Sequence, residues 1–399
     1  MDTNTPLYNK RQFWTYKRFH SKGNKKSKTN NNNNMESRNS ETRNGETRNG
    51  ESRNGETRNG KSRKAKKTKI FHLVDNKIAT DRELIKRLDT IYIPPAYKDV
   101  VIAKSANNKI QAIGTDTRGR RQYIYNPAFI RRRNDRKYDD ILELAKKITA
   151  IESDNHAMMQ SLARKSSIQE WQFPNDFIPI IVYMLRTYHF RIGNERYVDA
   201  NQSYGITTLR KEHIKWHPSI PNRFTIEFIG KKGILNSFTD ENQLMAKLLH
   251  HLCDRCENCG NGYLFKYQNP STKEIEFITP EHIQTFFQDK YNAYITPKMF
   301  RTWYGNYHLL EALQQMYQKE ELTPRTHKST KNEIIRKCSE HVSSKLNNTP
   351  TVSKQSYIDD KILNLVMRNP YRIAGLIPTT DEGRHKFLYK ILTRVRNSH

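Results

Sequence analysis

The sequence has few of the residues that build a disulfide framework or a membrane anchor. Only 35% of its 399 residues are hydrophobic, and four cysteines are too few for a disulfide scaffold of this length. No apolar run approaches the length that spans a membrane, and the segment after Met1 lacks the apolar centre of a signal peptide. We therefore expect no membrane partner and a reducing compartment.

Acidic residues are also scarce, because 41 Asp and Glu stand against 70 Lys and Arg, a formal net charge of +29. Residues 1–69 hold 19 basic and 6 acidic residues, a net of +13, which leaves +16 on the remainder. Such a charge repels itself, but it favours binding to a polyanion because Lys and Arg release counterions from phosphates. Nucleic acid is the expected partner, rather than a small metabolite.

Residues 1–67 have too little apolar surface to offset the entropy cost of ordering the chain. They contain an asparagine run at 30–34, a five-residue repeat between 41 and 60 and a basic run at 61–67. We predict a disordered, basic, low-complexity tail. Its basic end serves as a nuclear localisation signal or a DNA tether, or is simply solvated.

Residues 68–140 show the strand and turn signals of a small, mainly antiparallel β domain. Its last predicted strand carries the candidate DNA contacts Arg120, Arg121, Gln122, Tyr123 and Tyr125. Alternation places Tyr123 and Tyr125 on one face of that strand. Guanidinium groups suit phosphates, whereas amides and rings can reach base edges. The alternative is an edge strand with solvated arginines.

Residues 141–369 are predicted to form a larger, mainly α-helical catalytic domain with a small three-stranded sheet. Helical patterns extend over 139–165, 177–188, 241–252, 281–292, 298–318, 331–346 and 353–368. Strands are expected near 207–209, 213–216 and 224–229, with a hairpin turn at 230–233. Residues 370–399 are a basic extension, either a further helix against DNA or a solvated end. The predicted fold class is α+β.

Four short segments, each a weak signal alone, occur in a fixed order. They are Arg191-Ile-Gly-Asn-Glu, Phe228-Ile-Gly-Lys231, Lys298-Met-Phe-Arg301-Thr and Ser353-Lys-Gln-Ser-Tyr357. Together they resemble the type IB DNA topoisomerases of the small poxvirus-like form, over roughly residues 68–368. The resemblance implies a two-domain clamp around duplex DNA. It also implies that Tyr357 is the nucleophile, Arg191 and Arg301 are catalytic arginines, and Lys231 is the general acid.

The same resemblance implies relaxation of supercoiled DNA by cleavage and religation of one strand through a 3′-phosphotyrosyl intermediate. No ATP, metal or other cofactor is expected, and the protein is expected to be a monomer. Tyr197, just after the first motif, is a further candidate for DNA contact. A large DNA virus is the implied source, with action in a cytoplasmic viral factory or virion, or in the nucleus.

These residue types suit attack on a phosphodiester. A phenol with a pKa near 10 is a poor nucleophile at pH 7, so neighbouring cations must favour the transition state. Forked arginine donors on the non-bridging oxygens are worth about 3–4 kcal/mol each when lost. In the predicted helix 353–368, Tyr357 shares a stripe with Lys361, Asn364 and Arg368, which would place its hydroxyl among polar groups.

Two positions depart from the family pattern. Many members carry a histidine nine residues before the tyrosine, where this chain has Asn348. An amide can still donate a hydrogen bond to a phosphate oxygen, although it carries no charge. The family's acidic residue after the turn lysine is Lys232 here, which raises the local positive potential.

Other interpretations remain at this stage. Cys253, Cys256 and Cys259, with two histidines before them, have a spacing that could bind zinc, but a closed site needs four ligands. They could equally share one helical face. A tyrosine recombinase would run the same chemistry, but it would have a histidine where this chain has Lys298. A non-catalytic DNA-binding architectural protein is the third alternative.

Overall fold

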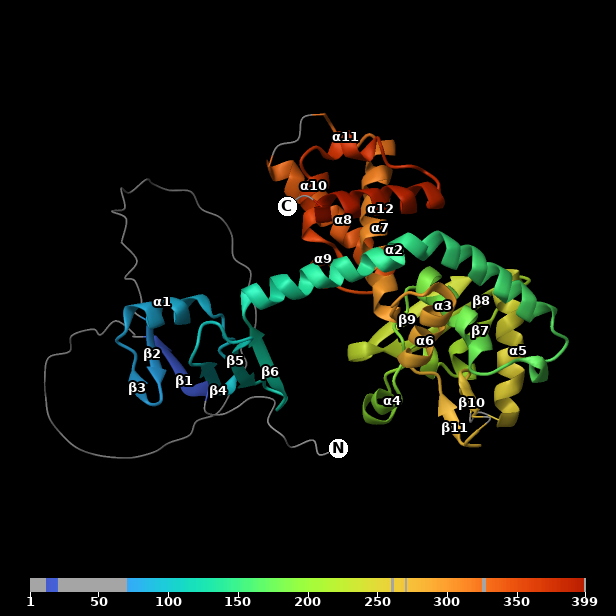
Figure 1. Cartoon of the computed structure of the whole chain (residues 1–399), viewed down its shortest axis with the longest axis horizontal. Coiled ribbons are helices and arrows are strands. Elements are labelled where there is room, and N and C mark those ends of the chain that lie inside the picture. The colour runs from blue at the N-terminus through green and yellow to red at the C-terminus, as the bar shows by residue number, and fades with distance from the viewer. Residues whose placement is uncertain (1–11, 21–69, 260–261, 270, 325–327, 398–399) are drawn as a thin grey trace, which may run out of the picture. The chain divides into compact units, whose positions relative to one another are not determined.

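A computed structural model describes residues 12–20, 70–259, 262–269, 271–324 and 328–397. The chain divides into two units, residues 1–133 and 134–399, and the division falls inside the long helix α2 (Pro127–Arg164) (Figure 1). Among the described residues, no helix is long and apolar enough to cross a membrane. Each unit has its own hydrophobic core.

The first unit is an antiparallel sheet with one short helix. The strands run in the order β3-β2-β1-β4-β5-β6. Their bounds are β1 Phe13–His20, β2 Ile70–Val74, β3 Lys77–Ile78, β4 Lys98–Ala103, β5 Ile110–Thr115 and β6 Arg121–Tyr125, and the helix is α1 Arg82–Thr90. Asp81 begins α1 by accepting a hydrogen bond from the Leu84 amide, as an N-cap carboxylate does. The predicted small β domain is confirmed.

Strand β1 corrects the prediction that residues 1–67 lack structure. Phe13–His20 pairs with β2 on one side and β4 on the other, so it lies inside the sheet. Tyr16 is buried in the core of the unit, and its hydroxyl forms a hydrogen bond with His72 Nδ1 at 2.8 Å. The segment is rich in aromatic residues that favour strands, a local signal that the polar composition of the tail obscures. Residues 1–11 and 21–67 of the predicted tail lie outside the described residues.

The second unit is mainly helical. Its small sheet is β7 Ile214–Trp216, β8 Phe224–Gly230 and β9 Ile234–Asp240, and a hairpin pairs β10 Lys266–Gln268 with β11 Ile275–Phe277. Its helices after α2 are α3 Ile178–Thr187, α4 Glu195–Asn201, α5 Gln243–Cys259, α6 Pro280–Tyr291, α7 Pro297–Gln318, α8 Lys328–Leu346, α9 Pro350–Tyr357, α10 Asp360–Val366, α11 Pro370–Ala374 and α12 Asp381–Asn397. The predicted α+β class with a three-stranded sheet is confirmed, although the 207–209 segment is a helical turn and the third strand is β9.

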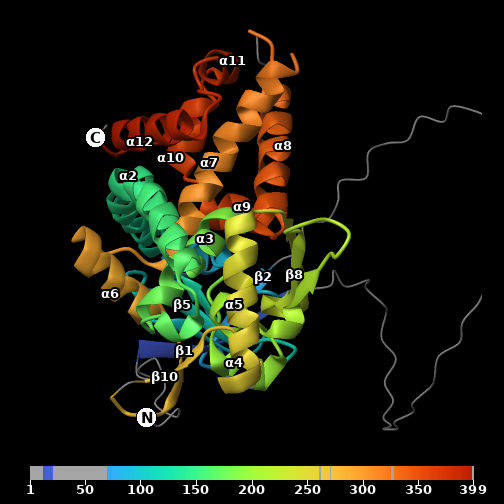
Figure 2. The same ribbon diagram turned by 90° about the vertical axis from the view of Figure 1, so that its right-hand side faces the viewer.

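Helix α7 is the centre of the second unit. It packs against α3, α8, α9, α11 and α12, and Figure 2 shows α8 and α12 on either side of it. Most of its residues are buried, including Phe300 and Trp303. Its buried polar residues include Arg301 and Asn306, so this central helix also carries polar groups into the interior of the unit.

Residues 370–397 form the further helices α11 and α12, which pack against α7 and so belong to this unit rather than forming a solvated end. Trp303 Nε1 on α7 donates to His385 Nδ1 on α12 at 2.9 Å. Arg396, at the end of α12, is buried and forms an ion pair with the buried Asp359. The apolar side chains Leu388, Ile391 and Leu392 complete the contact.

The predicted helix 353–368 is wrong as one continuous element. Helix α9 ends at Tyr357, Ile358 is extended, and Asp359 begins α10 by accepting from the Lys361 amide at 2.8 Å. Asn306 on α7 stabilises the break, because its Nδ2 donates to Tyr357 O and its Oδ1 accepts from Asp359 N. Tyr357 therefore does not share a helical stripe with Lys361.

Candidate active site

Tyr357 lies at the C-terminal end of α9, directly against α7. Gly305 makes this close approach possible, since a Cβ built there would lie 2.8 Å from both Tyr357 Cβ and Tyr357 O. Asn306 holds the Tyr357 carbonyl at 3.0 Å, and Lys137 on α2 donates to the carbonyl of Ser356 at 2.9 Å. The backbone on both sides of the tyrosine is thus fixed by hydrogen bonds.

Arg301 is the cation nearest to the Tyr357 hydroxyl. Its Nε lies 3.4 Å from the phenol oxygen, and its guanidinium carbon lies 5.1 Å from the centre of the ring. The guanidinium also donates to the carbonyls of His189 and, at 2.7 Å, Leu346. Only 4% of Arg301 is exposed, and burial lowers its pKa to about 10. The charge is therefore held in one place at low solvation.

The electrostatic environment favours ionisation of Tyr357. Burial alone would raise the pKa of the phenol, but the charge and hydrogen bond of Arg301, together with Arg191 and Lys298, outweigh it. The pKa of Tyr357 consequently lies below its ordinary value of 10.0. Of the 20 other tyrosines in the sequence, several buried ones show the opposite shift; Tyr188 and Tyr304, for example, both have a raised pKa.

Arg191 is positioned by a compact turn. Two glycines allow the turn to cross the 205–208 segment: a Cβ on Gly205 would lie 2.6 Å from Arg191 O, and one on Gly193 would lie 2.5 Å from Thr208 Oγ1. Asn194 then begins α4 by accepting from the Arg196 amide at 3.0 Å. In the Arg191-Ile-Gly-Asn194 sequence, the glycine therefore permits the turn and the asparagine begins α4, so that Arg191 lies before the helix.

Arg191 reaches the loop between α8 and α9. Its Nη2 donates to Asn348 Oδ1 at 2.5 Å, across 157 residues of sequence. Within the described part of the chain, the buried Asn348 Nδ2 has no hydrogen-bond partner. The Asn348 side chain therefore has an N–H donor available beside Arg191, two residues before the start of α9.

The hairpin between β8 and β9 is joined to the same loop. Asn347 Nδ2 donates to Leu235 O at 2.8 Å and to Asn236 Oδ1 at 3.0 Å. Lys231 lies in the turn, where Lys232 and Gly233 have left-handed φ angles of 68° and 74°. Lys231 is exposed, and none of the interactions described for the structure joins it to Tyr357.

The structure therefore brings together Arg191, Arg301, Asn348 and Tyr357, whereas no interaction described for the structure joins Lys231 to them. The contributions of Gly305 and Asn306 were missed by sequence reasoning. A glycine and an asparagine in the middle of a helix, where neither residue is favoured, were the available signal.

The candidate DNA contacts of the first unit lie on β6 and the turn before it. Asp116 accepts from Arg120 Nη2 at 2.8 Å and from Gln122 Nε2 at 3.0 Å, so both side chains already have an internal partner. Tyr123 and Tyr125 share a face, with ring centres 6.4 Å apart. On the opposite face Ile124 packs against the core, as alternation predicts.

Two further candidates lie in the second unit. Tyr197, on α4, is 62% exposed. Cys253, Cys256 and Cys259 all belong to α5, and Cys253 is buried, whereas the side chains of the other two lie outside those described. Cys338 is buried on α8, and burial raises its pKa to about 12, so this thiol belongs to the core.

Comparison with known proteins gives consistent results for both units. Residues 126–369 match the family described as eukaryotic DNA topoisomerase I, catalytic core, and residues 70–116 match the bacterial DNA topoisomerase IB N-terminal domain. The chain is 30% identical to DNA topoisomerase 1B of Acanthamoeba polyphaga mimivirus over 82% of this chain and 92% of that protein. It is 25% identical to the monkeypox virus DNA topoisomerase I and to the vaccinia virus (strain Copenhagen) DNA topoisomerase 1B, in each case over 81% of this chain and 93% of the relative.

Proposed function

Because the chain belongs to the type IB DNA topoisomerase family, we propose that it relaxes supercoiled duplex DNA through transient cleavage of one strand by Tyr357. One observation carries the assignment of the nucleophile: the Tyr357 hydroxyl lies beside the buried Arg301, and its pKa is lowered while those of other buried tyrosines are raised. A lowered pKa is what a phenol nucleophile requires near neutral pH.

The proposed reaction exchanges one phosphoester bond for another. The Tyr357 oxygen attacks a backbone phosphorus, the 3′-phosphotyrosyl bond forms, and the bond to the 5′-oxygen breaks. The departing 5′-oxygen takes a proton, which we assign to Lys231 as general acid. Its place in a hairpin turn with two left-handed residues supports a lysine carried by a turn that moves to the site when DNA binds. Religation is the reverse step and needs no ATP.

Charge on the transition state is stabilised by three groups. Arg301 has five N–H donors, of which three contact His189, Leu346 and Tyr357, so others remain for a phosphate oxygen. Arg191 supplies a second guanidinium. Asn348 Nδ2, which Arg191 orients through the amide oxygen, supplies a neutral donor in the place of the family's histidine. These groups can neutralise the phosphate without a metal, so we propose that no metal or other cofactor is required.

We propose that DNA contacts come from both units, which together clamp the duplex. Arg120, Arg121, Gln122, Tyr123 and Tyr125 are the contacts of the first unit, and Tyr197 is one of the second. Arg120 and Gln122 would exchange Asp116 for phosphate or base groups on binding. We further propose that the protein acts as a monomer.

The relatives that match this chain come from large DNA viruses, which supports a viral context. We propose action in a viral factory or virion in the host cytoplasm, or in the nucleus.

The test is relaxation of negatively supercoiled plasmid by the purified chain in EDTA without ATP. We expect wild type to relax the plasmid and Tyr357→Phe to bind DNA with unchanged affinity while relaxing none. Relaxation by Tyr357→Phe would reject Tyr357 as nucleophile. Exchange between two short duplex sites with little relaxation would favour a recombinase, and DNA binding by an inactive wild type would favour an architectural protein.

A further inference from the structure

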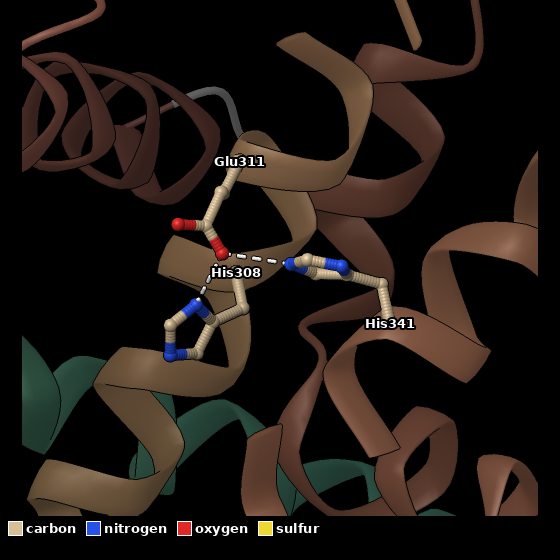
Figure 3. Close-up of side chains that lie close together, drawn as sticks. All are labelled: His308, Glu311 and His341. Atoms are coloured by element: carbon tan, nitrogen blue, oxygen red, sulfur yellow. Dashed lines mark hydrogen bonds and ion pairs between the residues drawn. The ribbon is translucent and has the colours of Figure 1, made fainter. Parts of the chain in front are cut away.

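A second cluster of titratable side chains lies between α7 and α8. His308 and Glu311 are three residues apart on α7, and His341 comes from α8. Figure 3 shows the three side chains pointing toward one another. Glu311 Oε2 lies 2.8 Å from His308 Nδ1 and 2.7 Å from His341 Nε2, and the three atoms lie within 4.8 Å of one another.

The cluster continues through the other nitrogen of His308. His308 Nε2 lies 2.8 Å from His189 Nε2, and His189 Nδ1 lies 3.4 Å from the Leu185 carbonyl oxygen. A row of three contacts therefore runs from Leu185 O through two imidazoles to the carboxylate of Glu311.

This row has too few protons for each of its three contacts to be a hydrogen bond. The carbonyl at one end and an ionised carboxylate at the other can only accept hydrogen bonds, and a neutral imidazole carries one N–H. Two neutral imidazoles supply two protons for three contacts. One contact is thus left with two lone pairs facing each other, and an added cation would remove that repulsion.

An extra proton on either imidazole would place a charge away from water, because only 6% of His189 and 7% of His308 are exposed. A cation bound at His308 Nδ1 leaves both imidazoles neutral and lets His308 carry its proton on Nε2, facing His189. Neutral imidazoles with an ionised carboxylate are the protonation states in which these groups bind metals.

We propose that His308 Nδ1, Glu311 Oε2 and His341 Nε2 bind one divalent transition-metal cation. Zinc(II) fits best, because two imidazoles and one carboxylate are a ligand set that it uses, with water in the fourth position. Zinc bonds of about 2.0–2.2 Å place tetrahedral ligands about 3.3 Å apart, so Glu311 moves from each imidazole by about half an ångström. The two imidazole nitrogens, which lie within 4.8 Å of each other, must approach by up to about 1.5 Å. The Glu311 and His341 side chains are 18% and 21% exposed, which gives them room to move.

Among the groups next to the proposed site, His189 favours binding of the cation and Lys345 opposes it. With a cation on Nδ1, His308 would carry its proton on Nε2 and donate to His189 Nε2, 2.8 Å away, and such an outer partner fixes the orientation of a ligating imidazole. A cavity of about 290 Å³, lined by His189, His308, Ser344 and Lys345 among others, adjoins the cluster. The charge of Lys345, which lines this cavity together with His308, acts against a cation here. Removal of that charge should therefore strengthen metal binding.

The site would join α7, which carries Arg301, to α8, which supplies one of the carbonyls that Arg301 contacts. The guanidinium donates to the carbonyls of His189 and Leu346, the latter at the C-terminal end of α8. A metal between α7 and α8 would fix the Leu346 carbonyl relative to Arg301 on α7, and His189 would be held through its contact with the ligand His308. The binding proposal itself does not depend on the function proposed above.

The test is metal titration of the full chain after treatment with a chelator. Cobalt(II) added in place of zinc reports its ligands by absorption, and zinc is then measured by competition. We expect one ion per chain with nitrogen and oxygen ligands, and zinc should raise the thermal unfolding midpoint. His341→Gln should weaken binding at least about 100-fold, because loss of an outer partner alone costs 10- to 100-fold. His156→Gln, an exposed histidine on α2, is the matched control and should bind as wild type does.

Equal binding by wild type and His341→Gln would overturn the proposal. So would a cobalt spectrum with a thiolate charge-transfer band alone, which would assign the ion to the α5 cysteines. Should His341→Gln fail to fold, Lys345→Met decides the question with all three ligands intact. Tighter binding by Lys345→Met than by wild type supports the site, and unchanged affinity rejects it.

Discussion

The substitution Gly305→Ala tests how closely Tyr357 is positioned by α7. An alanine Cβ at this position would lie 2.8 Å from Tyr357 Cβ and Tyr357 O, and 3.2 Å from the carbonyl carbon. Ordinary van der Waals contact begins near 3.4 Å, so the end of α9 must retreat by about 0.6 Å or more. The phenol oxygen would then leave its place beside Arg301, where it lies 3.4 Å from Nε.

The expected effect falls on the rate more than on stability. A misplacement of about 1 Å costs about 100-fold in rate, so a shift of 0.6–1 Å predicts cleavage about 10- to 100-fold slower. Overpacking costs about 1–3 kcal/mol, and replacement of a helical glycine by alanine recovers about 1 kcal/mol. The net loss in unfolding free energy should be about 0–2 kcal/mol.

The assay is single-turnover cleavage of a duplex oligonucleotide at saturating protein, with a thermal melt and a DNA-binding curve for each variant. Gly375→Ala is the matched control, since its new Cβ meets the Tyr317 ring at 3.1 Å and does not approach Tyr357. A folded Gly305→Ala protein that cleaves within about twofold of wild type would refute the claim that α7 sets the position of the nucleophile.

Three further predictions concern the supports of the site. Arg396→Met leaves Asp359 buried without its cation, so the free energy of unfolding should fall by about 3–5 kcal/mol in urea melts; Asp359→Asn in the same chain should recover part of it, and no recovery would contradict the pairing. Burial would raise the pKa of Glu152, but His385, Arg186 and Tyr304 lower it to about 2. Its stabilisation is therefore complete above its usual pKa of 4.5 and is lost as pH falls toward 2, so wild type should lose about 2 kcal/mol more than Glu152→Gln between pH 5 and pH 3; parallel losses would contradict this. Asn348→His should add an ionisation near pH 6.5 to the cleavage-rate profile, and an unchanged profile would remove this position from the site.

The sequence was sufficient for the fold class and for most of the site. The order of the motifs predicted a common site for Arg191, Arg301 and Tyr357. Arg191 and Asn348, which lie 157 residues apart in the sequence, form a hydrogen bond in the structure. Local composition was enough here because each motif contains its own turn or cap, such as the glycine and asparagine after Arg191.

The parts that could not be predicted depend on long-range partners. Strand β1 forms because β2 and β4 pair with both of its edges, which the polar segment around it does not reveal. The break after Tyr357 depends on Asn306, 51 residues away, whose amide replaces two backbone bonds of a continuous helix. The burial of Arg396 required knowing that Asp359 is its partner.

The position of Lys231 is a different case. The turn that carries it was predicted, but the residue is exposed and no interaction described for the structure joins it to Tyr357. The leaving group that it would protonate belongs to DNA, so sequence and structure of the protein alone give the turn and not the contact.

The most direct test of the central claim is to trap the covalent intermediate and identify its residue. A duplex whose cleaved strand loses a short 5′-hydroxyl fragment cannot be religated, so the protein remains attached to the 3′-phosphate. Digestion with protease and nuclease followed by mass spectrometry should find a nucleotide on the peptide that contains Tyr357, in EDTA and without ATP. A nucleotide on another residue, or an active enzyme without any covalent adduct, would contradict the account.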